Sequence, residues 1–138
     1  MSSSVLARVT GVHRTDAHVD ELETASEELG WRTVVLDGAE AEDTAAFLEV
    51  CSEAFALPEW FGLNWDALEE CLADLDLGGV DGVIVLWVSW SEFAEAQPRD
   101  FAVAVDVLAS AVRGWARDGI RGGVLLVGGG QQVGVDEL

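Results

Sequence analysis

Carboxylates recur every four residues in one short segment of this sequence, directly after a loop rich in aromatic side chains. Residues 57–75 read LPEWFGLNWDALEECLADL, and the spacing of Asp66, Glu70 and Asp74 places three carboxylates along one line of a helix. Paired carboxylates can act as general acid and base, or they can bind a magnesium ion. They can equally form an acidic surface for a cationic partner protein.

The sequence favours an acidic surface over a catalytic pair. General acid–base catalysis needs a cleft that raises the pKa of one carboxyl group, and no His, Ser or Cys partner is implied by the local spacing. Glu70 lies four residues from Asp66 and repels it, at a cost of about 0.2–0.5 kcal/mol. The aromatic side chains Trp60 and Trp65 flank this row, as anchor residues of protein interfaces often do.

Other residues with chemical potential form no convincing site. His13 and His18 lie near Asp16 and Asp20, but their spacing does not place both imidazoles on one helical face. The closing GGGQQVG follows a strand, yet no helix follows it to supply anion-binding amides. Cys71 falls on an apolar helical stripe, which is typical of a buried thiol. We therefore expect no catalytic residue, no metal site and no cofactor.

Charge is the outlying property of the composition. The net charge is −19, from 26 acidic and 7 basic residues, and every basic residue is an arginine. The lack of lysine excludes a phosphate-loop lysine and Schiff-base chemistry. Between Arg32 and Arg99 there is no basic residue, whereas 15 Asp and Glu fall in that window. Such a field repels nucleic acids and membranes and attracts a cationic partner, although solubility alone would also explain it.

The length of the chain predicts its domain count, and its apolar runs, N-terminus and cysteines predict its compartment. At 138 residues one domain is expected, covering residues 1–138. No apolar run approaches the roughly 18–20 residues that would span a bilayer. The opening MSSSVLARVTGVHRT lacks the basic and long apolar regions of a signal peptide, and two cysteines do not make a disulfide scaffold. We expect a cytoplasmic protein.

The elements expected to position the acidic row alternate between strand and helix. Strands are predicted at residues 5–9, 32–36, 83–88 and 123–127, and helices at 16–29, 43–56, 64–75 and 101–117. Asn64 is placed to cap the third of these helices, and Ser91 to cap a further short one. The run VIVLWV is typical of a strand covered on both faces. This alternation predicts an α/β domain with a parallel sheet.

Within the helix at residues 64–75 the apolar and acidic positions fall on different faces. One stripe is apolar and should pack inward, and it consists of Leu68, Cys71, Leu72 and Leu75. The carboxylates of Asp66, Glu70 and Asp74 lie well away from it, with Glu69 beside them. The acidic row is therefore expected to face outward.

The segment LPEWFGLNWDALEECL resembles the signature segment of the barstar family, the intracellular protein inhibitors of barnase-type extracellular ribonucleases. A weaker resemblance extends over residues 31–128. It implies a small parallel sheet with helices packed on it, preceded by an extension at residues 1–30 that adds a strand and a helix. Residues 129–138 are expected to form a flexible tail.

The resemblance also implies that the loop and helix plug the active site of a small basic ribonuclease, in a 1:1 complex with a monomeric inhibitor that is not an enzyme. Trp60 matches an aromatic residue that packs on the nuclease's catalytic histidine, and Asp66 matches an aspartate paired with basic active-site residues. Glu70 falls where the family has the aspartate that occupies the phosphate site. The partner-binding residues expected in all are Trp60, Gly62, Asn64, Trp65, Asp66, Glu69, Glu70 and Asp74.

Departures from the family pattern leave the identity of the target open. Glu70 is one methylene longer than the family's aspartate, and Gly114 falls where a further contact carries an acid. Two alternatives therefore stand beside ribonuclease inhibition. One is an acidic interaction or immunity protein for a partner that is not a ribonuclease, and the other is a carboxylate-based hydrolase.

Overall fold

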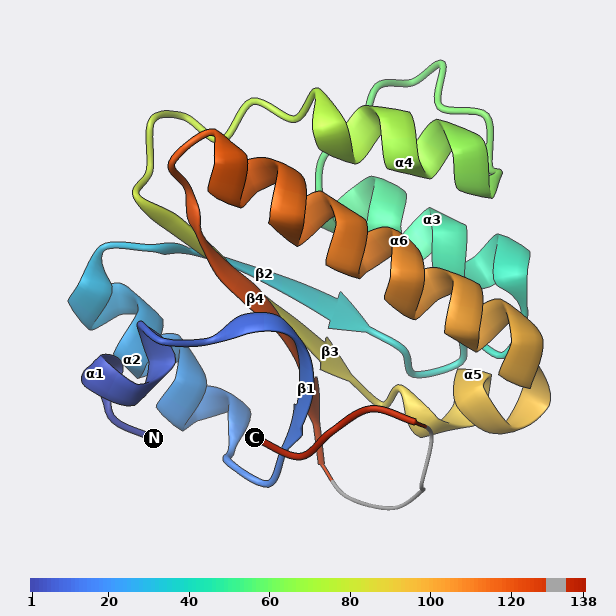
Figure 1. The fold of residues 1–138 in the computed structure, drawn as a ribbon. Helices are drawn as coiled ribbons and strands as arrows, with labels where there is room; N and C mark the ends of the chain where they lie inside the picture. The colour runs from blue at the N-terminus through green and yellow to red at the C-terminus, as the bar shows by residue number, and fades with distance from the viewer. Residues whose placement is uncertain (129–133) are drawn as a thin grey trace.

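A four-stranded parallel sheet forms the centre of the computed structural model, which describes residues 1–128 and 134–138 (Figure 1). The strands lie in the order β1-β4-β3-β2. Their bounds are β1 Thr10–Thr15, β2 Arg32–Asp37, β3 Gly82–Val88 and β4 Arg121–Val127. The first six residues of β3 are all buried, which confirms the expectation for VIVLWV.

Six helices connect and cover these strands in the part of the chain that the structure describes, and the predicted α/β class is confirmed. Four of them follow β2 in the chain. The bounds are α1 Ser3–Leu6, α2 Val19–Leu29, α3 Thr44–Ala54, α4 Trp65–Ala73, α5 Ser91–Ala96 and α6 Pro98–Arg117. The left-handed backbone of Gly30, with φ at 71°, ends α2.

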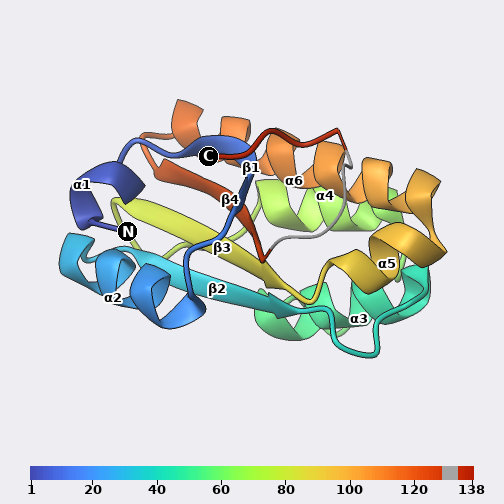
Figure 2. The same cartoon turned by 90° about the horizontal axis from the view of Figure 1, so that it is seen from below.

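The two faces of the sheet carry separate hydrophobic cores. Helices α3 to α6 contribute to the larger core, which includes Val85 and Trp87 of β3. The alternate residues of that strand, Ile84 and Leu86, point into a smaller core that Leu22 of α2 completes. Figure 2 shows the strands lying between α6 and α2. The sheet is therefore covered on both sides, which explains the continuous apolar runs of its inner strands.

The predicted N-terminal strand is misplaced, although the extension does add a strand and a helix. Residues 5–9 do not form a strand, because Ser2 accepts a hydrogen bond from the backbone of Val5 and begins the one-turn helix α1. Leu6 and Val9 are buried in the smaller core, and that burial accounts for their apolar spacing. The strand follows at β1, which pairs with β4 from Thr10 onward.

Three helix starts also differ from the prediction, the first being that of α2, which begins at Val19 rather than at residue 16. Ser91 is the first residue of α5 and does not cap it, since Trp90 occupies the cap position and is buried in the core. Helix α6 begins at Pro98 rather than at residue 101, because proline at the first helical position already has the required φ and needs no hydrogen-bond partner for its nitrogen.

The end of the chain returns to the sheet. The backbone of Arg14 in β1 accepts from Leu138 and donates to the carbonyl of Asp136, so the last residues lie along the outer edge of β1. Val135 is buried. The expectation of a free tail is therefore wrong for residues 135–138, and residues 129–133 lie outside the described part of the chain.

Candidate protein-binding surface

Helix α4 presents the acidic row, and its start is fixed by the residue that the sequence predicts. The side-chain oxygen of Asn64 accepts a hydrogen bond of 2.8 Å from the backbone of Ala67, which satisfies one of the free amides of the first turn. Leu68 and Leu72 are completely buried on the inner face of the helix. The predicted division of α4 into an apolar and an acidic face is confirmed.

A buried hydrogen bond holds the far end of α4 on α6. The indole nitrogen of Trp115 donates to the carbonyl oxygen of Leu72 at 3.0 Å. That carbonyl lies in the last turn of α4, where it also accepts a longer hydrogen bond of 3.4 Å from the backbone amide of Leu75. Nothing in the helical pattern of residues 101–117 distinguishes Trp115 as the residue that fixes α4, because only the fold brings the two helices together. The acidic row is thus displayed on a helix anchored at both ends.

The carboxylates of α4 are exposed and have no cationic partner. Asp66, Glu69, Glu70 and Asp74 are all exposed, and none of them forms an ion pair within residues 1–128 and 134–138. The last turn of α4 contains no basic residue, although the helix dipole favours cations there. Asp66 and Glu70 repel each other along the helix, as do Glu70 and Asp74. The acidic face therefore destabilises the free helix slightly.

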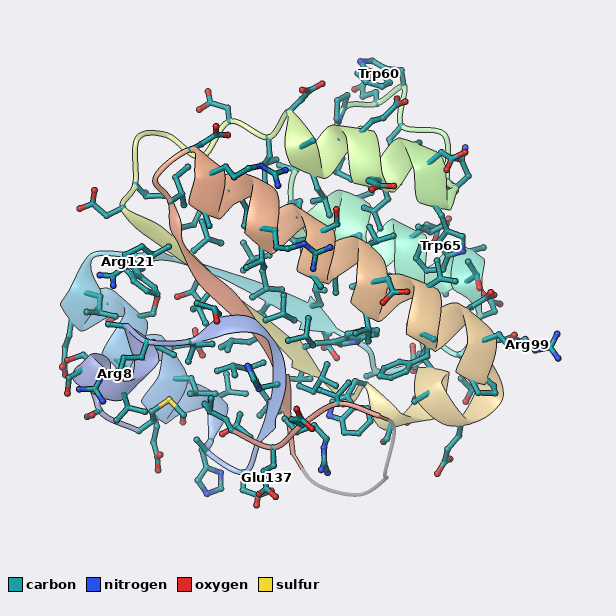
Figure 3. All side chains as sticks on the ribbon, in the orientation of Figure 1. Arg8, Trp60, Trp65, Arg99, Arg121 and Glu137 are labelled. Carbon is teal, nitrogen blue, oxygen red and sulfur yellow. The ribbon has the colours of Figure 1, made fainter. Side chains whose placement is uncertain are left out.

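The loop before α4 points one aromatic ring inward and its neighbour outward. The backbone amide of Phe61 donates to the carbonyl of Pro58 at 2.9 Å, and the Phe61 ring is buried. Trp60, the adjacent residue, has 76% of its surface exposed. In Figure 3 it stands out from the molecule beyond α4. A turn anchored by Phe61 therefore holds an indole in solvent, where a tryptophan gains nothing for the fold.

Trp65 and Gly62 lie beside the acidic row and differ in how far they are buried. Trp65 is half-buried, and its ring centroid lies 5.8 Å from that of Phe47 in the core. Gly62 is exposed, and a Cβ atom added to it would meet only the side-chain nitrogen of Asn64, at an ordinary 3.5 Å. The free protein has no steric need for glycine at this position.

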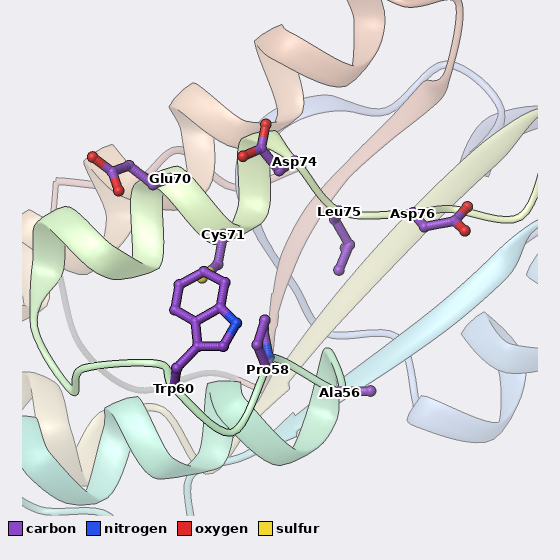
Figure 4. Close-up of a pocket in the computed structure, with 8 residues that line it drawn as sticks. All are labelled: Ala56, Pro58, Trp60, Glu70, Cys71, Asp74, Leu75 and Asp76. Carbon is purple, nitrogen blue, oxygen red and sulfur yellow. The ribbon is translucent and has the colours of Figure 1, made fainter.

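A surface pocket of about 320 Å³ lies between Trp60 and the outer part of α4 (Figure 4). Figure 4 shows the Trp60 ring beside Cys71, with Glu70 and Asp74 on the helix next to them. Burial raises the pKa of the Cys71 thiol, and the charges of Glu70 and Asp74 raise it further. Cys71 is therefore poorly suited to act as a nucleophile, in agreement with its place on the apolar stripe.

The remaining candidate residues lie apart from this surface. Trp87 and Trp90 are buried in the core. His18 is exposed before α2, whereas His13 belongs to β1. Within the described residues there is no group of three or more His, Cys, Asp or Glu side chains that could hold a metal ion. Among the described helices none is both long and apolar enough to cross a membrane.

The fold and this surface define a small α/β domain that displays an acidic helix face and an exposed tryptophan side by side. Residues 31–127 match the family described as Barstar (barnase inhibitor), and this match covers well over half of the chain. The chain therefore belongs to the barstar family, a family of inhibitors and not of enzymes. No curated protein matches the sequence. The match begins just before β2 and ends with β4, so α1, β1 and α2 lie outside it.

Proposed function

We propose that this protein inhibits a small basic ribonuclease of the barnase type by inserting α4 and the preceding loop into the nuclease active site. Trp60 carries the proposal, because its side chain is 76% exposed on an anchored turn directly beside carboxylates that have no described partner. Membership of the barstar family supports the same class of partner. The carboxylates and the exposed indole of this surface are complementary to a phosphate-binding groove lined with Arg and Lys.

The proposed mechanism involves binding alone. The carboxylates of Asp66 and Glu70 take the places of substrate phosphates, and the partner's guanidinium and ammonium groups pair with them. Trp60 packs on an aromatic or imidazole ring of the nuclease. Gly62 allows the partner to approach the loop backbone closely, which explains a glycine that the free fold does not require. Substrate is excluded because its own binding groups are occupied.

Rigidity favours this mechanism. The Asn64 cap, the buried Leu68 and Leu72 and the Trp115 hydrogen bond already hold α4 in one position. Little conformational entropy is then lost when the complex forms, so more of the interaction free energy appears as affinity. We propose that the protein is a monomer in a 1:1 complex and that it acts in the cytoplasm of the cell that makes the nuclease.

A carboxylate-based hydrolase fits the site less well. The acidic side chains are exposed, and catalysis by paired carboxylates requires a site in which one carboxyl group stays protonated near neutral pH. An acidic protein that binds a different cationic partner uses the same surface. A ribonuclease inhibitor is distinguished from such a protein by the loss of the partner's nuclease activity on binding.

The test is a titration of purified protein into several small basic ribonucleases of the barnase type, with RNA cleavage and complex size measured in parallel. We expect cleavage by at least one nuclease to fall linearly to zero at a 1:1 ratio. Saturating that nuclease's active site with a mononucleotide should slow association. A complex that leaves cleavage intact, or forms equally fast with the blocked enzyme, would contradict active-site insertion. Failure to bind any of these nucleases would contradict the assignment of the partner.

A further inference from the structure

A second surface pocket, of about 470 Å³, opens where β1 and β4 begin. Its lining comes from residues 7–9 before β1, the first two residues of β1, the last turns of α6 and the first two residues of β4. Figure 3 places Arg8 and Arg121 at the same side of the molecule, away from Trp60. The pocket is therefore separate from the proposed nuclease-binding surface.

Three of the seven arginines line this pocket, in a protein whose net charge is −19. Arg8, Arg113 and Arg121 are exposed, and none of their guanidinium groups makes a hydrogen bond or an ion pair in the described part of the chain. The lining contains no carboxylate. By contrast, the pocket beside Trp60 is lined by Glu70 and Asp74. Three arginines therefore line this pocket without an acidic residue among them.

Helix α6 explains only part of this cluster. Arg113 lies near the C-terminal end of the helix, where the dipole favours a cation. Arg121 begins a strand, and Arg8 follows the one-turn helix α1, so the dipole of α6 accounts for neither. Three separate parts of the chain each bring one guanidinium to the same pocket. A ligand with negative charge gives that convergence a physical reason.

The base of the pocket is apolar. The apolar part of the lining consists of Ala7, Val9, Val112 and Ala116, of which Val9 and Val112 are almost completely buried and Ala116 is exposed. Gly11 lies at the edge with φ at 69°, and a Cβ atom added there would meet no other atom within 4 Å. An apolar floor with a cationic rim matches a ligand that has an apolar body and an anionic group, and the volume is that of a small-molecule site.

We propose that this pocket binds a small organic phosphate with a flat apolar body, of the size of a nucleoside monophosphate. The phosphate lies among the guanidiniums of Arg8, Arg113 and Arg121, and the body rests on Val9 and Val112. A phosphate monoester carries nearly two negative charges at neutral pH and accepts paired hydrogen bonds from arginine, so it suits three guanidiniums better than a single carboxylate does.

The site belongs to the extended form of this domain. Residues 7–11 lie outside the matched residues 31–127, and they supply about half of the lining. Ligand binding here is therefore independent of nuclease inhibition. The carboxylates of α4 lie at a different side of the molecule, and at physiological salt a Debye length of about 8 Å screens their repulsion of the ligand.

Amide chemical shifts of the full chain test the proposal, with cytidine monophosphate, cytidine and inorganic phosphate as the three probes. We expect the nucleotide to shift the amide signals of Gly11 and Gly122 and to bind about tenfold more tightly than either of the other two. Arg121→Gln and Ala116→Glu should each weaken nucleotide binding by about tenfold or more. Arg99→Gln removes an exposed arginine far from the pocket and should have no effect.

Several results would overturn it. One is the absence of shifts at Gly11 and Gly122 at millimolar nucleotide. Another is an equal loss of binding in Arg99→Gln, which would indicate general attraction to arginines. Equal affinity for inorganic phosphate would remove the role of the apolar floor. Tight binding of an RNA oligonucleotide without any response to the mononucleotide would assign the surface to a polymer. Inhibition by Arg121→Gln should equal that of the parent, which separates this test from that of the proposed function.

Discussion

The two sides of the sheet differ in what their side chains do. On the side of α3 to α6, the outer face of α4 carries repelling carboxylates and the loop before it holds Trp60 in solvent, so this surface lowers the stability of the free protein slightly. On the side of α1 and α2, Leu6 and Leu22 are fully buried against β3 and β4. The residues proposed to bind the nuclease thus lie on the outside of the larger core, whereas the buried residues under α2 serve the fold.

This separation has a practical consequence for mutagenesis. Substitutions on the acidic face should change affinity and leave the free energy of unfolding nearly constant, because those side chains have few contacts in the free protein. Substitutions under α2 should do the reverse. A substitution that changed both the affinity and the free energy of unfolding would show that the two sides are coupled.

The largest effect is expected for Glu70→Ala. Loss of this carboxylate would leave the partner's cations buried without a counter-charge, at a cost of about 3–5 kcal/mol in binding free energy. The free protein should keep its stability or gain a few tenths of a kcal/mol, because repulsion with Asp66 and Asp74 is relieved. Inhibition constants and melting temperatures measure the two quantities.

Two further variants define the Glu70 result. Glu27→Ala removes the same charge from α2 and should leave inhibition unchanged. Glu70→Asp should preserve or improve inhibition if the target has a groove shaped for aspartate, and should weaken it if the groove is shaped for glutamate. A Glu70→Ala protein that inhibits as well as the parent would exclude α4 as the inhibitory face.

Leu22→Ala should produce the opposite pattern. Leu22 is completely buried between α2 and the sheet, so its truncation leaves a cavity and lowers the free energy of unfolding by about 2–5 kcal/mol. The inhibition constant of the folded fraction should not change, since Leu22 belongs to the smaller core and the buried residues of α4 belong to the larger one. Chemical denaturation and inhibition assays on the same preparation provide the comparison. Weaker inhibition by the folded variant would mean that the extension helps to shape the binding face.

Trp60→Ala should weaken binding by about 2 kcal/mol or more, because exposed tryptophans that become buried in a complex are frequent binding hot spots. The free protein should not lose stability, since most of the Trp60 ring contacts only solvent. Phe61→Ala is the matched variant at the next position. It should lower stability through lost burial and should affect binding only by loosening the turn that holds Trp60. Similar stability losses for the two variants would contradict the opposite orientations of these rings.

The sequence predicted the two faces of α4 better than it predicted the structure of the two chain ends. Helical spacing identified the apolar and acidic faces of α4, and Asn64 was recognisable as a cap because its side chain acts on its own turn. The Trp115 hydrogen bond to Leu72 joins residues 43 positions apart, and no local pattern encodes it. The pairing of Arg14 with the end of the chain is more distant still in sequence, since its partners are Asp136 and Leu138. The mostly apolar residues 5–9 suggested a strand, whereas Leu6 and Val9 are three positions apart and are both buried in the smaller core.

The arginine pocket could not be predicted from the sequence, because its arginines are far apart in the chain. Arg8, Arg113 and Arg121 come from three parts of the chain, and they come together only through the parallel pairing of β1 with β4 and the packing of α6 against these strands. By contrast, the acidic window between Arg32 and Arg99 was visible in the sequence, because it needs only a count of charges.

The smallest effect is expected for single charges at the edge of the acidic face, and it appears in the association rate. Long-range attraction of a cationic nuclease depends on the field at the face that it approaches, so the on-rate should fall by about tenfold between low and physiological salt. Asp74→Asn should reduce the on-rate at low salt a few-fold, whereas Glu27→Gln, which changes the net charge equally on the α2 side, should reduce it less. Both differences should vanish at high salt. Stopped-flow association at several salt concentrations distinguishes a local field from the effect of net charge. Equal slowing by the two variants would show that total charge alone steers the partner, and that the acidic row contributes only after contact.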